Sequence, residues 1–232
     1  MQDDRIALSV YEQHRRQLML GAAAAVLVPF ATPAHAAVEL EGVELEETIM
    51  AHGQKLVLNG AGVRKRGYFK ADVTALYLPE KRTTTDAVFK LNGVRRIQLN
   101  ILREFTASTI SRIFIADFKQ HATDAEFKQL ITEISQVGAA YGAVKRVGKG
   151  DVVNLDWVPG KGWMAYFNGK LLTFDTGVAG SPSNVMAINN ELAYQIYLRM
   201  YIGPEAPTDL RNGLMGLTRL PKAAGGARES DN

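Results

Sequence analysis

Hydrophobic and polar residues alternate along several stretches of the chain, a pattern typical of β-strands. The clearest run spans residues 68–78, and residues 96–102 repeat it. Residues 153–157, 163–167 and 171–174 follow, separated by the turn sequences Pro159-Gly160 and Asn168-Gly169. These last three runs predict an antiparallel meander. Between residues 55 and 67, the glycines of Asn59-Gly60-Ala61-Gly62 predict a turn or a bulge between strands.

The apolar spacing changes to that of helices after residue 106. Apolar residues at 110, 113, 114 and 118 form one helical stripe. Thr123 and Glu126 form a capping-box sequence that predicts a second helix extending to about Val137. A short helix is expected over residues 84–91, a long one from Ser181-Pro182 to Met200, and a last short one capped by Thr208. The element order predicts an α+β domain, an open-faced β-sandwich with a helix layer on one face of an antiparallel sheet.

The N-terminal segment has the three parts of a signal peptide. Arg15-Arg16 precede an apolar run over residues 18–31, and Ala34-His35-Ala36 supplies small residues before a cleavage point. The run is too short to span a bilayer. We therefore expect a signal peptide at 1–36, one domain at 37–220 and a disordered tail at 221–232. The protein is then exported, to the periplasm or otherwise, with no membrane span after cleavage; the paired arginines suit a twin-arginine signal.

Composition excludes several classes of chemistry. The 232 residues include no cysteine, so disulfides, thiolate metal sites and cysteine nucleophiles are ruled out. After cleavage only His52 and His121 remain, far apart in sequence, and we expect no metal and no cofactor. The net charge of +3 is small and the basic residues are scattered, which argues against a nucleic-acid partner. The oligomeric state is left open.

Two aspartates occupy positions where a packed domain favours apolar residues. Asp117 lies on the apolar stripe of the helix that follows residue 106, and Asp72 is in the middle of the strand over 68–78. A buried carboxylate needs a cation or hydrogen-bond donors, or its pKa shifts until it is neutral. The cation that the sequence offers as a candidate partner is Arg64. The alternative is that both aspartates face solvent at an edge of the sheet and helix layers.

At these residues the chain resembles the chalcone isomerase-like family. The resemblance covers roughly residues 38–217 and rests on short motifs in a set order. The motifs are Leu56-Val57-Leu58-Asn59-Gly60-Ala61-Gly62-Val63-Arg64, Tyr68-Phe69-Lys70, Ala75-Leu76-Tyr77-Leu78-Pro79, Lys149-Gly150-Asp151, Phe167-Asn168-Gly169, Ile202-Gly203-Pro204 and Leu214-Met215-Gly216.

The resemblance implies a ligand cleft with five positions of interest. In the plant enzymes an arginine, a threonine, a tyrosine, an asparagine and a late-helix polar residue line it. Here those positions carry Arg64, Asp72, Ile110 and Asp117, and the last falls near Tyr194. The anion-binding arginine is thus present, but the hydroxyl network that would support ring closure is incomplete, because Ile110 has no donor.

Three functions follow from this resemblance. Some family members bind fatty acids without catalysis, so the leading hypothesis is an apolar cleft with Arg64 at its base that binds an amphipathic carboxylate such as a fatty acid. Asp72 competes with that carboxylate for Arg64. The second hypothesis is an isomerase or intramolecular lyase of altered chemistry, with Arg64, Asp72 or Asp117 as catalytic candidates. The third is a scaffold with a vestigial, filled cleft that binds a partner protein.

Overall fold

The structure, a computed structural model, describes residues 37–173 and 185–223. The predicted signal peptide, the predicted helix start at Ser181-Pro182 and residues 224–232 of the predicted tail lie outside these ranges. All statements below concern the described residues.

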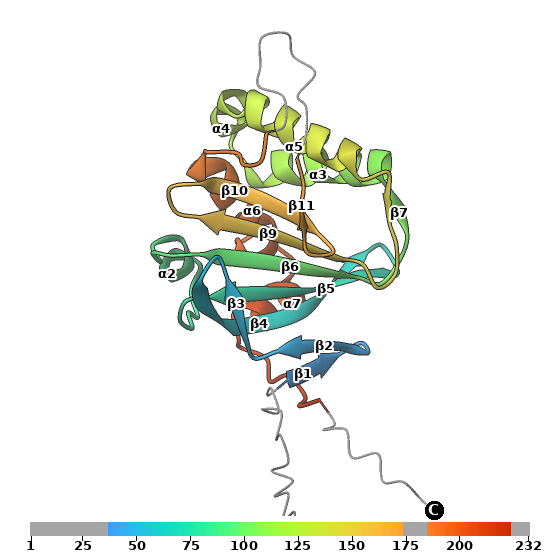
Figure 1. The fold of residues 1–232 in the computed structure, drawn as a ribbon, viewed down its shortest axis with the longest axis vertical. Helices are drawn as coiled ribbons and strands as arrows, with labels where there is room; N and C mark the ends of the chain where they lie inside the picture. Colours follow the sequence, from blue (N-terminus) through green and yellow to red (C-terminus); the bar gives the residue numbers. More distant parts are fainter. Residues whose placement is uncertain (1–36, 174–184, 224–232) are drawn as a thin grey trace, which may run out of the picture. The chain divides into compact units, whose positions relative to one another are not determined.

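An antiparallel sheet forms the centre of the domain (Figure 1). Its seven strands lie in the order β11-β10-β9-β6-β5-β4-β3, and each neighbouring pair is antiparallel. The predicted runs coincide with strands, but of the run over 171–174 only Leu171 lies in one, and β3 was not predicted. The bounds of the seven strands are β3 Thr48–Ala51, β4 Gln54–Arg66, β5 Phe69–Leu78, β6 Arg95–Ile101, β9 Val152–Val158, β10 Gly162–Phe167 and β11 Lys170–Leu171.

Side chains of the central strands alternate between two apolar layers. Leu76 and Leu78 of β5 belong to the larger core beneath the helices, whereas Val73, Ala75 and Tyr77 belong to a smaller core on the opposite face. Both faces of this sheet are therefore buried at its centre. For burying an aliphatic side chain fully, the gain is about 1.5–3 kcal/mol relative to leaving it exposed.

The helices cover one face of the sheet, as the α+β prediction requires (Figure 1). Helices α3, α5 and α6 contribute the buried residues of the larger core, and α7 packs on β4. The helix bounds are α2 Thr85–Phe89, α3 Ala107–His121, α4 Asp124–Gln129, α5 Ile131–Ala143, α6 Glu191–Ile202 and α7 Thr208–Leu214.

Three helix boundaries differ from the prediction. The predicted second helix has its capping box at Thr123 and Glu126, but it is interrupted at Leu130 and continues as α5. The long helix begins at Glu191, because Ile188 instead pairs with Trp163 of β10 and Asn190 caps the helix through the N–H of Ala193. Helix α7 begins at Thr208, whose side chain makes no capping hydrogen bond.

The glycines between residues 59 and 62 lie within one continuous strand rather than between two strands. The register of β4 against β5 shifts between Leu58 and Gly60, which is the bulge alternative. Gly60 and Gly62 also permit close packing of α7. A Cβ atom at Gly60 would overlap the backbone oxygen of Gly213, and one at Gly62 would lie 3.1 Å from Leu210.

Two further strand pairs were not predicted. Strands β1 Ala37–Leu40 and β2 Val43–Glu46 form a hairpin, and β7 Phe105–Thr106 pairs with β8 Arg146–Val147. Lys222 bridges to Val38, and the N–H of Ala223 donates to the carbonyl of Ala37. The start of the predicted tail, residues 221–223, is therefore paired with β1.

Candidate functional site

An apolar cavity lies between the sheet and the helix layer. Its walls come from β5, β6, β9 and β10 on the sheet side and from α3, α5 and α6 on the other. Its volume is about 100 Å³. A water takes up about 30 Å³ in the liquid, so the cavity has room for roughly three groups of that size.

The cavity contains an ion pair between neighbouring strands, which we call the inner ion pair. Arg64 of β4 stands opposite Asp72 of β5 in the strand register. Its Nε and Nη2 both contact Oδ2 of Asp72, at 2.7 and 2.6 Å. The Asp72 side chain is 1% exposed, which excludes the alternative that it faces solvent, and that of Arg64 is 20% exposed.

Hydrogen bonds satisfy Asp72 more completely than Arg64. Oδ1 of Asp72 accepts a 2.6 Å hydrogen bond from the hydroxyl of Thr74. Burial opposes the charge on Arg64, but the charge and hydrogen bond of Asp72, together with Tyr201 and Tyr197, outweigh it and raise the pKa of Arg64 above its ordinary value. Within the described chain, Nη1 of Arg64 makes no hydrogen bond. A guanidinium can donate five hydrogen bonds, so Arg64 has capacity for another anion.

A second ion pair connects the sheet to helix α3, and we call it the outer ion pair. Both guanidinium nitrogens of Arg66 donate to the carboxylate of Asp117, Nη1 to Oδ1 at 3.0 Å and Nη2 to Oδ2. Its side chains are 32% and 17% exposed, so it lies nearer to solvent than Asp72 does. The cation for Asp117 is therefore Arg66 and not Arg64, although both pairs line the cavity.

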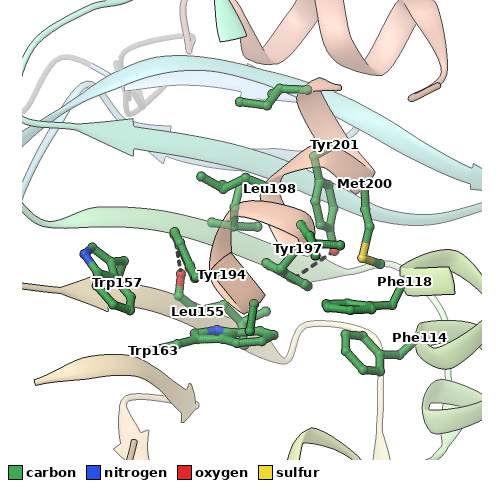
Figure 2. Packing of buried hydrophobic residues seen from close by; sticks show 14 of the residues in the cluster. Phe114, Phe118, Leu155, Trp157, Trp163, Tyr194, Tyr197, Leu198, Met200 and Tyr201 are labelled. Atoms are coloured by element: carbon green, nitrogen blue, oxygen red, sulfur yellow. Dashed lines mark hydrogen bonds between the residues drawn. The ribbon is translucent and has the colours of Figure 1, made fainter. Parts of the chain in front are cut away.

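Tyrosines supply the cavity's phenolic hydroxyl groups, one from α5, Tyr141, and two from α6. Tyr197 and Tyr201 line it, and their hydroxyls share a 2.9 Å hydrogen bond (Figure 2). The guanidinium of Arg64 lies 5.6 Å from the ring centroid of Tyr201, in cation–π range. Burial raises the pKa of Tyr201 above its ordinary value and that of Tyr197 well above it. Both hydroxyls therefore remain protonated donors near neutral pH.

Aromatic side chains pack the inner wall of the cavity (Figure 2). The ring of Trp163 lies 4.9 Å from that of Tyr197, and Phe114 of α3 is 6.5 Å from both. Aromatic pairs favour offset and tilted arrangements of this kind, so these contacts hold the rings in defined orientations. This wall is therefore apolar and rigid.

Four of the five residues implied by the resemblance line the cavity, namely Arg64, Asp72, Ile110 and Asp117. Tyr194 does not. Its hydroxyl donates to the carbonyls of Arg95 and Leu155 beneath the sheet, at 2.9 and 3.3 Å (Figure 2). The tyrosines on that helix that do line the cavity are Tyr197 and Tyr201, three and seven positions later. Helical periodicity places all three on adjoining faces, so spacing alone could not choose between them.

Among residues 37–173 and 185–223, no group of three or more His, Asp or Glu side chains is arranged to hold a metal ion. In the same part of the chain, no helix has both the length and the apolar character needed to cross a membrane.

Comparisons with known proteins identify similar chains. A family model described as chalcone isomerase-like matches residues 37–216. Among solved structures, a fatty-acid binding protein of Arabidopsis thaliana is similar with a TM-score of 0.62, covering 78% of this chain and 95% of that one at 13% sequence identity. At that identity the likeness shows a shared fold. The search of curated proteins finds no match.

Proposed function

The chain belongs to the chalcone isomerase-like family, and on that premise we propose that it binds an amphipathic carboxylate without catalysing a reaction. The acyl chain occupies the apolar cavity and the carboxylate contacts Arg64. The observation that carries this proposal is an arginine in the wall of an apolar cavity with one terminal nitrogen free of hydrogen bonds in the described chain. The named fold relative, a fatty-acid binding protein, is consistent with it.

Asp72 sets the strength of this binding. A ligand carboxylate near Arg64 also lies near the negative charge of Asp72, which opposes it. Asp72→Asn removes that charge while keeping a side chain that can accept from Thr74. We expect this variant to bind decanoate more tightly than the wild type by isothermal titration calorimetry. Weaker binding by Asp72→Asn would contradict the proposed position of the carboxylate.

The size of the cavity predicts the length of the acyl chain. A methylene group is similar in size to a water, so roughly three such groups fit without rearrangement. Each buried methylene adds about 0.8 kcal/mol, or roughly fourfold in affinity. Affinity should therefore rise steeply from acetate to butanoate and more slowly from butanoate to decanoate, because a longer chain must widen the cavity or extend out of it. Decanol, of equal length but uncharged, should bind more weakly than decanoate; equal binding would remove the role of Arg64.

The isomerase alternative is supported by one observation, the hydroxyl pair of Tyr197 and Tyr201 beside Arg64. A proton-transfer reaction also needs a base, and the two carboxylates that line the cavity are each paired with an arginine. We therefore expect no conversion of chalcone to flavanone above the buffer rate. Turnover that Arg64→Met abolishes would establish the enzyme instead. A vestigial scaffold requires a filled cleft, which is at odds with the cavity.

We also propose export, with cleavage after Ala36, from the sequence of the N-terminal segment. The intact mass of protein recovered from the periplasm tests it. A mature chain beginning at Ala37 is the expected result, and a full-length chain in the membrane fraction would count against it.

A further inference from the structure

The hairpin turn between β4 and β5 presents two aromatic residues to solvent. Arg66 pairs with Phe69 in the strand register, so Gly67 and Tyr68 are the two central residues of the turn. Gly67 adopts a φ of 57°, as the first position of a two-residue hairpin turn can require. Tyr68 is 102% exposed and Phe69 is 55% exposed. Exposed neighbouring aromatics indicate an interaction surface more than isolated ones do.

Basic residues surround this aromatic tip, which consists of Tyr68 and Phe69. Lys65 and Lys70 flank it in the paired strands. The guanidinium of Arg103, beyond the end of β6, lies 4.0 Å from the ring centroid of Phe69. Lys149 adds a further charge, because its turn is hydrogen-bonded to Ile101 through the N–H of Gly150.

Acidic residues at this end of the sheet are fewer: Asp151, beside Lys149, accepts from the N–H of Gly148 and from Asn168, and three others each contact one cation. Glu41 accepts from Lys70 at 2.6 Å, Asp117 pairs with Arg66, and Glu104 lies 3.5 Å from Arg146. No salt bridge involves Lys65 or Arg103 in the described part of the chain. The surface around the tip is therefore positive.

The aromatic tip also adjoins the cavity. Arg66 on one side of the turn and Ala71 on the other both line the cavity. Arg66 connects the hairpin to helix α3 through Asp117 of the outer ion pair. A ligand that enters the cavity from the side of the aromatic tip would therefore meet the outer ion pair, which is the more exposed, before the inner ion pair.

We propose that the aromatic tip docks on the surface of an anionic lipid bilayer. Tyrosine and other amphipathic aromatic rings favour the interfacial layer, where one part of the ring is apolar and another is hydrated. Basic residues near an anionic surface each contribute about fivefold in affinity. A stable protein interface buries roughly 1,000 Å² or more, and a narrow hairpin tip offers little of that area. A bilayer surface can bind a few inserted side chains without so large a contact.

Co-sedimentation with vesicles tests the proposal, using vesicles of phosphatidylcholine alone and of phosphatidylcholine mixed with phosphatidylglycerol. All proteins are purified in one processed form, verified by mass, so the N-terminal segment is the same in each. The wild type should sediment with the anionic vesicles and less so at high salt. The double variant Tyr68→Ser/Phe69→Ser should lose at least about tenfold in partitioning, and Lys65→Gln about fivefold.

A matched control replaces exposed apolar residues elsewhere. Met50 is 67% exposed and Leu217 is 62% exposed, and Met50→Ser/Leu217→Ser should sediment like the wild type. An equal loss of sedimentation in the control and tip variants would overturn the proposal. A wild type that sediments with neither kind of vesicle would also overturn it and would favour a protein partner. Decanoate binding in vesicle-free buffer should be unchanged in the tip variant, so this inference and the proposed function can fail separately.

Discussion

The two faces of the central sheet each bury one aspartate against an arginine of the neighbouring strand, but only one of these pairs borders a cavity. Asp72 and Arg64 lie on the helix-covered face. Asp156 of β9 and Arg96 of β6 lie on the other face and also stand opposite one another in the strand register. Asp72 and Asp156 are both 0% exposed. Burial and charge are thus alike in the two pairs, and their hydrogen bonding differs.

The opposite-face pair of Arg96 and Asp156 has a different geometry from the inner ion pair. Nε of Arg96 donates to Oδ1 and Nη2 to Oδ2, both at 2.7 Å, which is the bidentate arrangement. His52 donates a third hydrogen bond to Oδ2 at 2.8 Å. In the inner ion pair, both contacts of Arg64 fall on one carboxylate oxygen. Among the described residues, Nη1 makes no hydrogen bond in either arginine, so the cavity beside Arg64 is what allows the inner ion pair, and not the opposite-face pair, to receive a ligand.

The largest effect is expected from Asp156→Ala. It leaves Arg96 and His52, whose side chains are 14% and 13% exposed, without their common acceptor. Breaking a buried pair from one side costs about 3–5 kcal/mol. Urea unfolding should show this loss of stability, while decanoate binding to the folded protein stays near the wild-type value. A stability change below about 1 kcal/mol would mean that the pair is solvated.

Arg64→Met should destabilise the protein less than Asp156→Ala does, by about 2–3 kcal/mol. Thr74 still donates to Asp72 in this variant, and the methionine side chain fills part of the space that the arginine occupied. Chemical unfolding in the absence of ligand measures it. A loss larger than that of Asp156→Ala would reverse the contrast, making the inner ion pair the main structural one.

The tyrosines of the cavity predict a loss of stability at alkaline pH. Burial raises the pKa of Tyr201 in the folded state above its value near 10 in the unfolded chain. Below about pH 10, Tyr201 is protonated in both the folded and the unfolded chain, and the stability of the protein is undiminished. As the pH rises from there towards the folded-state pKa, only the unfolded chain releases the proton, so the free energy of unfolding falls. Unfolding free energies between neutral pH and about pH 11 should fall more slowly in Tyr201→Phe, by about 1 kcal/mol per pH unit at the alkaline end. Equal slopes in the wild type and Tyr201→Phe would mean that Tyr201 ionises as readily in the folded protein as in the unfolded chain.

The smallest effect concerns His52, which adopts a φ of 51° in the β3–β4 turn. Asparagine tolerates this conformation, and Asn-Gly is a favoured hairpin turn, so His52→Asn preserves the turn but is too short for Asp156. We expect a net loss of about 1 kcal/mol, since one hydrogen bond to a charged group is removed. Thermal melts measure it. A more stable variant would show that turn strain outweighs the contact with Asp156.

Local patterns in the sequence predicted most of the fold. Alternation identified β5 and β6, and the capping box identified the start of α4. The short strands β1 and β7 were missed because four or two residues carry too little periodicity. The interruption at Leu130 was missed because apolar spacing continues through it.

The site was less predictable, because its pairings join elements that are distant in sequence. The resemblance brought attention to Arg64, Asp72 and Asp117, but nothing in the sequence assigns Arg66 rather than Arg64 to Asp117, 51 positions away. The contact between His52 and Asp156 spans 104 positions and depends on how the β3–β4 hairpin lies over the sheet. Tyr194 and Tyr201 lie on the same face of α6, about two turns apart, so the place of the cavity along the helix axis, set by packing, decides that Tyr201 and not Tyr194 reaches it.

Calorimetric titration of decanoate into the wild type, Arg64→Met and Arg96→Met tests the central claim most directly. The two variants make the same substitution in the two arginine–aspartate pairs, on opposite faces of one sheet. Hydrogen bonds to a charged group contribute about 1.5–3 kcal/mol. Arg64→Met should therefore weaken binding by at least about tenfold, whereas Arg96→Met should bind like the wild type while folded. Equal affinity of all three proteins, or an equal loss in both variants, would contradict a carboxylate site at Arg64.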